Sequence, residues 1–372
     1  MNRKEKISQI ALSQTEGIGN ATIKRLVTHA GSAEAILQCS FKELVRLLGG
    51  YKRLAANILR EDALAKASDT LLAHERAKID IITLQEDAYP ERLARLPDAP
   101  FIIYTRGHTQ LNTTKVVSVV GTRKATSYGK QVVDTLMDAF REYSVLVVSG
   151  LAYGIDVHAH QRALEYGLPT VGVLAGGVDA VYPAGNKDIA VAMLQNGCLL
   201  SEHPMCVRPE VRQFAARNRI IAGLSDLTIV VEAGERSGAL ITAHFANEYH
   251  REVFAVPGRI YDARSQGCLN LIKTHQAHLL SDISDIVHVM NWDQNVPTAR
   301  RLNLNVMDRF TNLTNREKNI VQTLDRLQKE VALDELSYQA NMPYSQMAGV
   351  LLGLEVKNVV RFMPGKKFKL AV

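Results

Sequence analysis

Two short apolar segments of this chain are each followed by residues whose types suit the binding of an anion. Residues 116–120 lead into Gly121-Thr122-Arg123, and residues 145–149 lead into Gly150. Glycine lets backbone N–H groups approach a ligand closely, and an arginine can donate two parallel hydrogen bonds to a phosphate. The residues expected to form this anion site are Gly121, Thr122, Arg123, Ser149, Gly150 and Gly154.

The densest basic point in the middle of the chain is Arg217-Asn218-Arg219, which closely follows Phe214. Two guanidinium groups and an aromatic ring suit a single-stranded nucleic acid, because the cations pair with phosphates and the ring stacks under a base. The alternative is structural: Arg219 would tie a helix to a neighbouring carboxylate, and Phe214 would belong to the core. Spacing alone leaves both interpretations open. The predicted site is completed by Ser237 and Gly238, after the apolar residues 227–231.

Asp156, His158 and His160 are the residues that could serve an enzyme, as metal ligands or as an acid and a base. The two histidines are two positions apart on a predicted helix, so they do not face together. Asp156 is interpreted as an N-cap that closes the turn after Gly154. The sequence contains no His-Glu-x-x-His, no Gly-x-Ser-x-Gly, no complete Walker loop and no Gly-x-Gly-x-x-Gly. We therefore predict no catalytic residue, no metal and no NAD or FAD.

The elements that must position these residues alternate between strand and helix. Short β-branched runs are typical of buried parallel strands, and amphipathic stretches of helical period follow them. This alternation predicts an α/β fold, an extended Rossmann-like parallel sheet with helices on both faces, in which ligands bind at the carboxyl ends of the strands. The predicted strands are 79–84, 101–104, 116–120, 145–149, 170–174, 198–200, 227–231 and 253–256, and the predicted helices are 129–142, 156–166, 186–196, 210–223 and 238–249.

The N-terminal residues 1–75 have helical patterns only. Gly17-Ile18-Gly19 is followed by an amphipathic run, as in the turn of a helix-hairpin-helix motif, and residues 48–50 resemble a degenerate second copy. Such a turn presents backbone N–H groups to a nucleic-acid phosphate. A tight turn between helices, or a helical protein-docking domain of the SAM type, explains the pattern equally well.

The C-terminal residues predict a linker and then a winged helix. Residues 291–305 are polar, contain Pro297 and lack periodicity. Thr314 and Glu317 form a capping box at the start of a helix, which two shorter helices and a hairpin follow. The predicted helices are 314–328, 333–340 and 345–354, the hairpin strands are 359–362 and 367–370, and the turn between them is Pro364-Gly365. The predicted domains are 1–75, 76–290, the linker 291–305, and 306–372.

The third of these C-terminal helices, in the position of a recognition helix, has no Lys or Arg from residue 345 to residue 355. A helix that reads the major groove normally carries such residues. The positive charge lies on the wing, at Arg361, Lys366, Lys367 and Lys369. We predict a partner-docking or weak backbone-binding module that does not read base sequence.

Composition and charge restrict the class of protein. The chain has 372 residues, 47% of them hydrophobic, with no apolar run long enough for a membrane span and no signal-peptide core, which favours a cytoplasmic protein. Its four cysteines form no Cys-x-x-Cys pair and are expected to be reduced and mostly buried. The formal net charge is +6, but residues 76–305 hold 23 Lys/Arg and 23 Asp/Glu. Phosphate binding by the middle domain must therefore come from a local cluster.

Several segments, in order, resemble the DNA-processing protein A family (DprA, also called Smf). They lie within roughly residues 80–290. They are VGTR at 120–123, SGLAYGIDVHAH at 149–160, YP at 182–183, RNRIIAGLS at 217–225, VEA at 231–233, SGALITA at 237–243 and VPG at 256–258.

This resemblance implies a Rossmann-like domain that binds single-stranded DNA, forms a homodimer and is not an enzyme. It also implies a role in natural transformation, in which the protein protects incoming strands and loads the recombinase RecA onto them. The rival family is the lysine-decarboxylase-like nucleotide hydrolases, which need a Pro-Gly-Gly-x-Gly-Thr segment. Here the corresponding residues 232–238 lack the proline and the double glycine. A nucleotide-binding pocket without catalysis stays open.

Overall fold

The computed structural model describes residues 2–292, 313–327, 331–357, 359–363 and 367–370. The chain divides into two compact units, Met1–Trp292 and Asp293–Val372. Most of the predicted linker, the turn Pro364-Gly365 and Lys366 lie outside the described residues. Among the helices that the structure describes, none has both the length and the apolar content needed to cross a bilayer.

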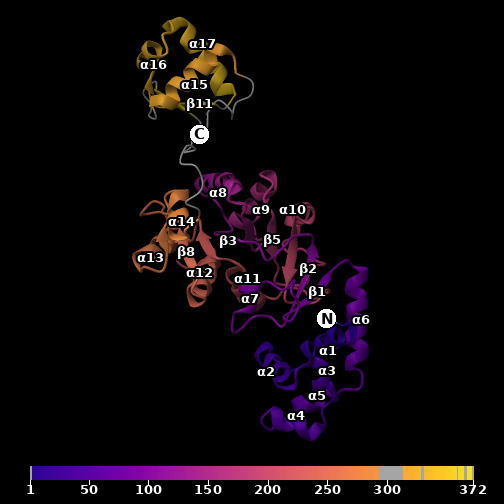
Figure 1. The fold of residues 1–372 in the computed structure, drawn as a ribbon. Coiled ribbons are helices and arrows are strands. Elements are labelled where there is room, and N and C mark those ends of the chain that lie inside the picture. The colour runs from indigo at the N-terminus through magenta and orange to yellow at the C-terminus, as the bar shows by residue number, and fades with distance from the viewer. Residues whose placement is uncertain (1, 293–312, 328–330, 358, 364–366, 371–372) are drawn as a thin grey trace. The chain divides into compact units, whose positions relative to one another are not determined.

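Six helices open the first unit, as the sequence predicts (Figure 1). Side chains of Asn2, Ser32 and Ser40 cap three of them by accepting backbone N–H groups. The two expected glycine turns are present, because Gly17, Gly49 and Gly50 all have positive φ, which glycine adopts without strain. The helices are α1 (Arg3–Ser13), α2 (Asn20–Ala30), α3 (Ala33–Gln38), α4 (Phe41–Leu47), α5 (Lys52–Ile58) and α6 (Ala63–Arg76).

A nine-stranded sheet forms the centre of the same unit, with the order β1-β2-β6-β5-β4-β3-β7-β8-β9. From β6 to β9 every neighbouring pair is parallel, as predicted. The strands are β1 (Asp80–Thr83), β2 (Ile102–Gly107), β3 (Val116–Val120), β4 (Leu146–Ser149), β5 (Thr170–Val173), β6 (Gly197–Ser201), β7 (Leu227–Val230), β8 (Glu252–Ala255) and β9 (His278–Leu279).

One feature of the sheet corrects the expectation of purely parallel pairing. Strand β2 pairs antiparallel with both β1 and β6. The connection between β1 and β2 contains only one short helix, α7 (Glu91–Ala94), and the two strands extend the sheet beyond β6. A strand's own side chains show that it is buried but not which way its neighbour runs, so the residue pattern could not predict this direction.

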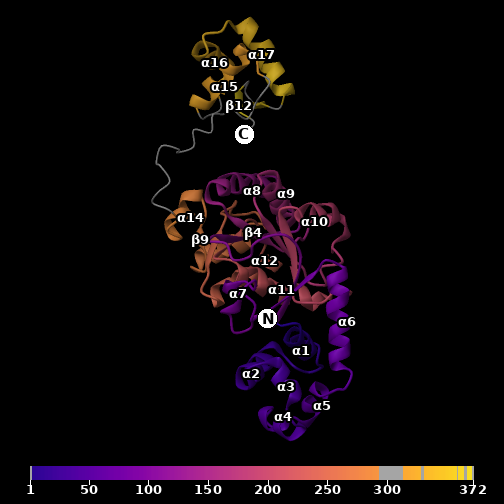
Figure 2. The ribbon, with the colours of Figure 1, turned by 45° about the vertical axis from the view of Figure 1, so that its right-hand side comes forward.

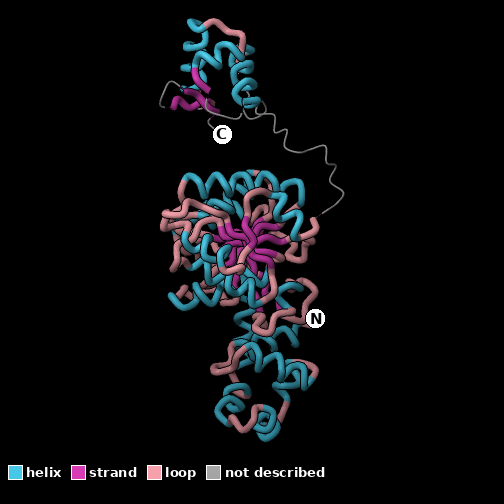
Figure 3. Tube along the Cα trace, turned by 90° about the vertical axis from the view of Figure 1, so that its left-hand side faces the viewer, coloured by secondary structure: helices cyan, strands magenta, loops and turns pink. Residues whose placement is uncertain are grey.

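Helices cover both faces of the sheet, and the strands form the middle layer (Figures 2 and 3). One face packs against α8 (Ser127–Phe140), α9 (Ile155–Glu165) and α14 (Ile283–Val289). The other packs against α11 (Val211–Leu224), α12 (Gly238–Glu248) and α13 (Gln266–Lys273). The remaining helix is α10 (Lys187–Met193), and single 3₁₀ turns lie at Arg141–Tyr143 and Ala184–Asn186.

The N-terminal helices share their apolar core with the sheet. Leu12 and Leu71 belong to the same buried cluster as Ile81 of β1, Tyr104 of β2 and Met193 of α10. The arrangement shows why the first 292 residues behave as one compact unit. The boundary between residues 75 and 76 stays a prediction.

The described residues of the second unit form three helices and a three-stranded sheet of order β10-β12-β11. The Thr314–Glu317 capping box is confirmed: the Thr314 backbone N–H and hydroxyl both donate to Glu317 Oε2, at 2.7 and 3.0 Å. Strand β10 was not predicted, because two residues are too few to carry a pattern. The elements are α15 (Asn315–Leu327), β10 (Val331–Ala332), α16 (Leu333–Gln339), α17 (Tyr344–Val356), β11 (Val360–Met363) and β12 (Lys367–Leu370).

Candidate nucleic-acid interface

The predicted site lies along the carboxyl edge of the parallel strands. Strand β3 pairs with β4 on one side and β7 on the other, and the chain continues in opposite directions from this point. Such a reversal of strand order is where open α/β sheets bind their ligands. The loops after β3, β4, β5 and β7 therefore meet at this edge.

A carboxylate of the protein occupies the N-terminus of α8, the helix after β3. Glu232 is 4% exposed, and its two carboxylate oxygens accept hydrogen bonds from the Thr126 backbone N–H at 2.9 Å and the Thr126 hydroxyl at 2.5 Å. A Cβ at Gly129 would lie 2.3 Å from Glu232 Oε2, so only glycine lets the carboxylate pack against this turn. The position that attracts an external anion at a helix N-terminus is thus filled by Glu232.

Asp156 has a similar position at α9, which corrects its interpretation as an N-cap. The N-cap is Gly154, with φ +82°, and Asp156 is the second residue of the helix. The buried Asp156 carboxylate accepts the backbone N–H groups of Gly121, Gly150 and Ala152, which lower its pKa. Burial is the largest effect and raises the pKa of Asp156 above its ordinary value, while Arg217 opposes it. Two of the N–H groups expected to hold a phosphate are therefore already paired.

Arg217 lies beneath the surface and joins two strand ends. It is 6% exposed, and its Nη1 donates to the carbonyl oxygen of Gly150 at 2.8 Å and to that of Val173. Burial lowers the pKa of Arg217 to about 10, and Asp156 acts in the opposite direction. A Cβ on Gly150 would lie 2.7 Å from Arg217 Nη2 and 2.8 Å from Asp156 Oδ2, so this packing requires glycine. Arg217 and Asp156 together hold the predicted site in shape.

The sequence contains a helical pattern that predicts the burial of Arg217, but the basic cluster around it suggested a surface position. Arg217 precedes Ile220, Ile221 and Leu224 by three, four and seven residues, and all four are buried on one face of α11. This spacing is that of a core-facing helical stripe. The helical period therefore indicated that Arg217 points inward, whereas its charge suggested a surface ligand.

Other predicted residues also have partners within the protein. The Ser149 hydroxyl is fully buried and donates to the Val119 carbonyl oxygen at 2.6 Å. Arg219 pairs with Glu202 and donates to the Asp98 carbonyl oxygen at 2.8 Å. These contacts match the alternative interpretation, in which Arg219 ties a helix to a neighbouring carboxylate. Asn218 donates to the Gly238 carbonyl oxygen at 3.1 Å. Ser237 caps α12, and Gly238 is exposed.

Arg123, Phe214 and Tyr182 form a group at the surface of this edge. The Arg123 guanidinium lies over the Phe214 ring, 5.9 Å from its centre, and Arg123 is exposed. The Tyr182 ring is centred 5.5 Å from that of Phe214 and is 57% exposed. Gly154 packs against the backbone of Thr122 and Arg123, since a Cβ on it would lie 2.2 Å from the Thr122 carbonyl oxygen and 2.7 Å from that of Arg123. A cation and exposed rings are the groups that bind single strands.

Tyr182 was absent from the predicted site. The sequence places it after the predicted strand 170–174 and in the YP segment of the family resemblance, but these signals did not assign it a binding role. Its place beside Phe214 depends on a loop and on helix α11, which are distant in sequence and meet only in the folded chain.

The histidines have separate structural partners. His158 Nε2 lies 2.7 Å from Asp134, and His160 Nδ1 lies 2.7 Å from the Thr170 hydroxyl. Among the described residues, no cluster of three His, Cys, Asp or Glu side chains could hold a metal ion. The four cysteines are free; Cys198 and Cys268 are buried, while Cys206 is exposed, so the expectation of mostly buried thiols holds for half of them.

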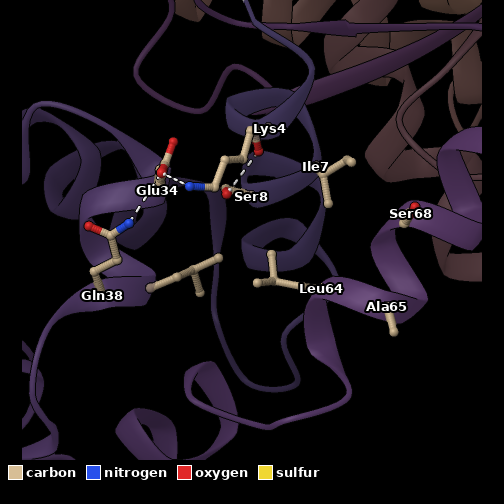
Figure 4. Close-up of a pocket in the computed structure, with 9 residues that line it drawn as sticks. Lys4, Ile7, Ser8, Glu34, Gln38, Leu64, Ala65 and Ser68 are labelled. Carbon is tan, nitrogen blue, oxygen red and sulfur yellow. Dashed lines mark hydrogen bonds and ion pairs between the residues drawn. The ribbon is translucent and has the colours of Figure 1, made fainter.

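A pocket elsewhere in the unit lies among α1, α3 and α6 (Figure 4). Its lining includes Ile7, Leu37 and Leu64, and the charges at its rim, Lys4 and Glu34, pair with each other. The lining offers no unpaired charge for a phosphate and is far from the strand-end loops in the chain. The strand-end edge is therefore the candidate site.

The fold and site define a Rossmann-like α/β protein whose strand-end edge presents a cation and aromatic rings at its surface. The model of the family described as DNA recombination-mediator protein A matches residues 80–291. The chain belongs to this recombination-mediator family, DprA/Smf, which confirms the resemblance read from the sequence.

Relatives match both the sequence and the structure. Protein Smf of Synechocystis is 29% identical, over 99% of this chain and 100% of its own length. The X-ray structure of DprA from Streptococcus pneumoniae superposes with a TM-score of 0.66 at 31% identity, covering 77% of this chain and 98% of that one. DprA from Helicobacter pylori, described with its single-stranded DNA binding mode, has a TM-score of 0.52 at 30% identity, covering 57% and 96%.

Proposed function

We propose that this protein binds single-stranded DNA along the carboxyl edge of its sheet, with little dependence on base sequence. The observation that carries the proposal is the exposed Arg123 guanidinium stacked on Phe214, next to the exposed Tyr182 ring. The description of the H. pylori relative supports it. Arg123 binds a phosphate, with its planar group oriented by the ring beneath it.

Within this proposal the residues of the predicted site divide into two roles. Thr122, Arg123 and Gly238 lie at or near the surface and contact DNA, and the Phe214 ring supports Arg123. Ser149, Gly150, Arg217 and Arg219 are held by internal hydrogen bonds and position the loops. Gly121, Gly154, Asn218 and Ser237 shape the backbone on which the contacting residues sit.

The internal carboxylates disfavour a nucleotide as the ligand. A mononucleotide or dinucleotide phosphate would bind at the helix N-termini after β3 and β4, and Glu232 and Asp156 already neutralise both. A third anion there would be repelled. We therefore propose a protein without nucleotide hydrolysis, in which DNA is held by side chains at the surface.

We further propose that the bound strand is passed to RecA during natural transformation. The protein works in the cytoplasm as a homodimer. Its domains are 1–75, 76–290 and 306–372, with a linker between the last two. Membership of a recombination-mediator family supports the transfer to RecA. The test measures DNA-dependent ATP hydrolysis by RecA on single strands coated with a single-strand-binding protein. Addition of this protein should shorten the lag before RecA begins to hydrolyse ATP. The Arg123→Ala variant should leave the lag as long as it is without the protein.

The direct test of the site is Arg123→Ala. Loss of one phosphate contact should weaken binding to an oligothymidylate several-fold and reduce the slope of log affinity against log salt by about 0.7. Arg76→Ala, at an exposed arginine that ends α6, is the control and should change neither quantity. Fluorescence anisotropy titrations at two or more salt concentrations measure both. Equal affinity for the Arg123 variant and the original protein would remove Arg123 from the site.

The nucleotide alternative has its own test. Purified protein is incubated with nucleoside monophosphates, and the free base is measured by chromatography. We expect no release above that of buffer. If the protein released free base and a substitution in the pocket abolished that release, the protein would be a nucleotide hydrolase and the present proposal would be wrong.

A further inference from the structure

We infer that Tyr182 is the residue on which a DNA base stacks, and that Phe214 serves mainly to hold Arg123 and Tyr182 in place. The inference rests on the proposed function and names the base-binding residue of the same site. The sequence had pointed to Phe214 as the stacking ring. The contacts of the three side chains lead to a different assignment.

Phe214 already has two neighbours that use its ring. The Arg123 guanidinium lies 5.9 Å from the ring centre, and the Tyr182 ring lies 5.5 Å away, tilted by 55°. Phe214 is also only partly exposed. A base that stacked on Phe214 would have to displace one of these neighbours, so the energetic gain of stacking would be offset by the lost contact.

Tyr182 has the opposite properties. It is 57% exposed, and among the hydrogen bonds of the described residues none involves its hydroxyl. Its ring packs against Phe214, and part of its aromatic surface is open to solvent. An exposed ring that is supported from beneath loses little side-chain entropy when a base stacks on it.

The charge beside Tyr182 fits the backbone of the same nucleotide. Arg123 and Tyr182 both contact the Phe214 ring, so the guanidinium group and the exposed tyrosine ring lie close to each other. Single strands are bound by this combination, in which phosphates meet cations while bases stack on rings. The geometry points to one nucleotide whose phosphate pairs with Arg123 and whose base lies on Tyr182.

The experiment compares Tyr182→Ala, Tyr182→Phe and a control, Tyr338→Ala, which removes an 84% exposed tyrosine from α16 in the other unit. Binding to an oligothymidylate and to an abasic oligonucleotide of equal length is measured with the full chain. On the oligothymidylate, Tyr182→Ala should lose about five-fold or more in affinity, while Tyr182→Phe and Tyr338→Ala stay near the original protein. Tyr182→Ala removes the stacking contact with a base and no phosphate contact. Its salt slope should therefore equal that of the original protein.

The abasic strand separates stacking from general damage. Tyr182→Ala and the original protein should bind it equally, because it offers no base to stack. An unchanged affinity of Tyr182→Ala for the oligothymidylate, or an equal loss on both strands, overturns the inference. If Arg123→Ala weakens binding while Tyr182→Ala does not, only the base assignment fails. If the original protein binds neither strand, the proposed function fails with it.

Discussion

At the scale of single residues, two buried carboxylates determine what this edge of the sheet can bind. Glu232 accepts hydrogen bonds from Thr126, the N-cap residue of α8, and Asp156 accepts three backbone N–H groups and lies near the Arg217 charge. In many α/β proteins such N–H groups receive the ligand's phosphate. Here the protein's own carboxylates occupy these positions, so the DNA binding that we propose depends on side chains at the surface.

Arg217→Ala tests the assignment of Arg217 as a positioning residue. It leaves the carbonyl oxygens of Gly150 and Val173 without this donor and removes a positive charge that favours the ionised form of Asp156, which should destabilise the protein by about 1–3 kcal/mol. DNA affinity should fall, but the salt slope should stay unchanged, because no phosphate contact is lost. Urea unfolding and salt titration measure the two effects.

The matched variant for Arg217 removes both charges, Asp156→Asn with Arg217→Gln, and should lose less stability than the two single changes added together. A salt slope reduced by about 0.7 in Arg217→Ala would show instead that the guanidinium reaches a phosphate.

His160 predicts a loss of stability in acid. Thr170 Oγ1 donates to the Val147 carbonyl oxygen at 3.0 Å, so it accepts from His160 Nδ1, and His160 Nε2 is buried without a partner. Burial, with Arg217 nearby, lowers the pKa of His160 from 6.5 to about 3. Between about pH 6.5 and pH 3, His160 is therefore protonated in the unfolded chain but neutral in the folded chain. The free energy of unfolding should fall as the pH falls through this range.

The measurement for His160 is the free energy of unfolding between pH 7 and pH 4, compared with that of His160→Gln. The variant should have a smaller decrease over this range, because glutamine does not titrate. Parallel curves for the two proteins would assign the acid sensitivity to other groups.

At the scale of elements, the wing of the second unit gathers positive charge on one face. Arg361 of β11 is directly opposite Lys369 of β12, and Met363 is opposite Lys367. Opposed residues of an antiparallel pair lie on the same face, so three cations adjoin each other there. The exposed side of α17 carries Tyr344, Ala348 and Leu352 and no cation.

This arrangement predicts binding to a nucleic-acid backbone without base reading. Two duplexes of equal length and different sequence should bind the full chain with the same affinity, and Arg361→Ala with Lys369→Ala should reduce the duplex salt slope by about 0.9 for each lost contact. Leu352→Ala on α17 is the control and should bind both duplexes as before. A preference for one sequence that Leu352→Ala abolishes would show that α17 reads bases.

At the scale of the whole molecule, each unit has its own apolar core. The core clusters of the first unit end at Trp292, and that of the second contains only residues after it. Trp292 closes the first unit: its ring lies 6.3 Å from that of Phe140 and 5.5 Å from that of Tyr143, with Lys115 Nζ 5.6 Å from its centre. A tryptophan this buried contributes several kcal/mol to its unit.

Truncation tests this division. A chain ending at Asp293 should unfold in one cooperative transition and bind single-stranded DNA within about two-fold of the full chain, because the proposed site and its core are intact. A chain ending at Val289 loses Trp292 and should be less stable by about 3–5 kcal/mol. Calorimetry and anisotropy provide the readouts. Equal melting of the two shortened chains would contradict the role of Trp292.

The sequence by itself determined the order and kind of most elements. Runs such as Val116–Val120 are continuous and β-branched, and helix signals such as Thr314 with Glu317 are local, so neighbouring residues are enough to specify them. The family was also evident from short segments in order. The place of the proposed site was predicted from the same local information, because carboxyl ends of parallel strands meet at one edge.

Only the tertiary structure decided which of the candidate residues are exposed at the surface. Arg123 and Arg217 are both arginines beside glycine-rich loops, yet one is exposed and the other is 6% exposed. Arg217 lies on the buried face of α11 and donates to carbonyl oxygens at the ends of two strands, whereas Arg123 lies over a ring at the surface. The contact between Tyr182 and Phe214 and the direction of β2 likewise depend on segments distant in sequence. Charge and residue type are local properties, whereas burial and pairing depend on what the rest of the chain packs against them.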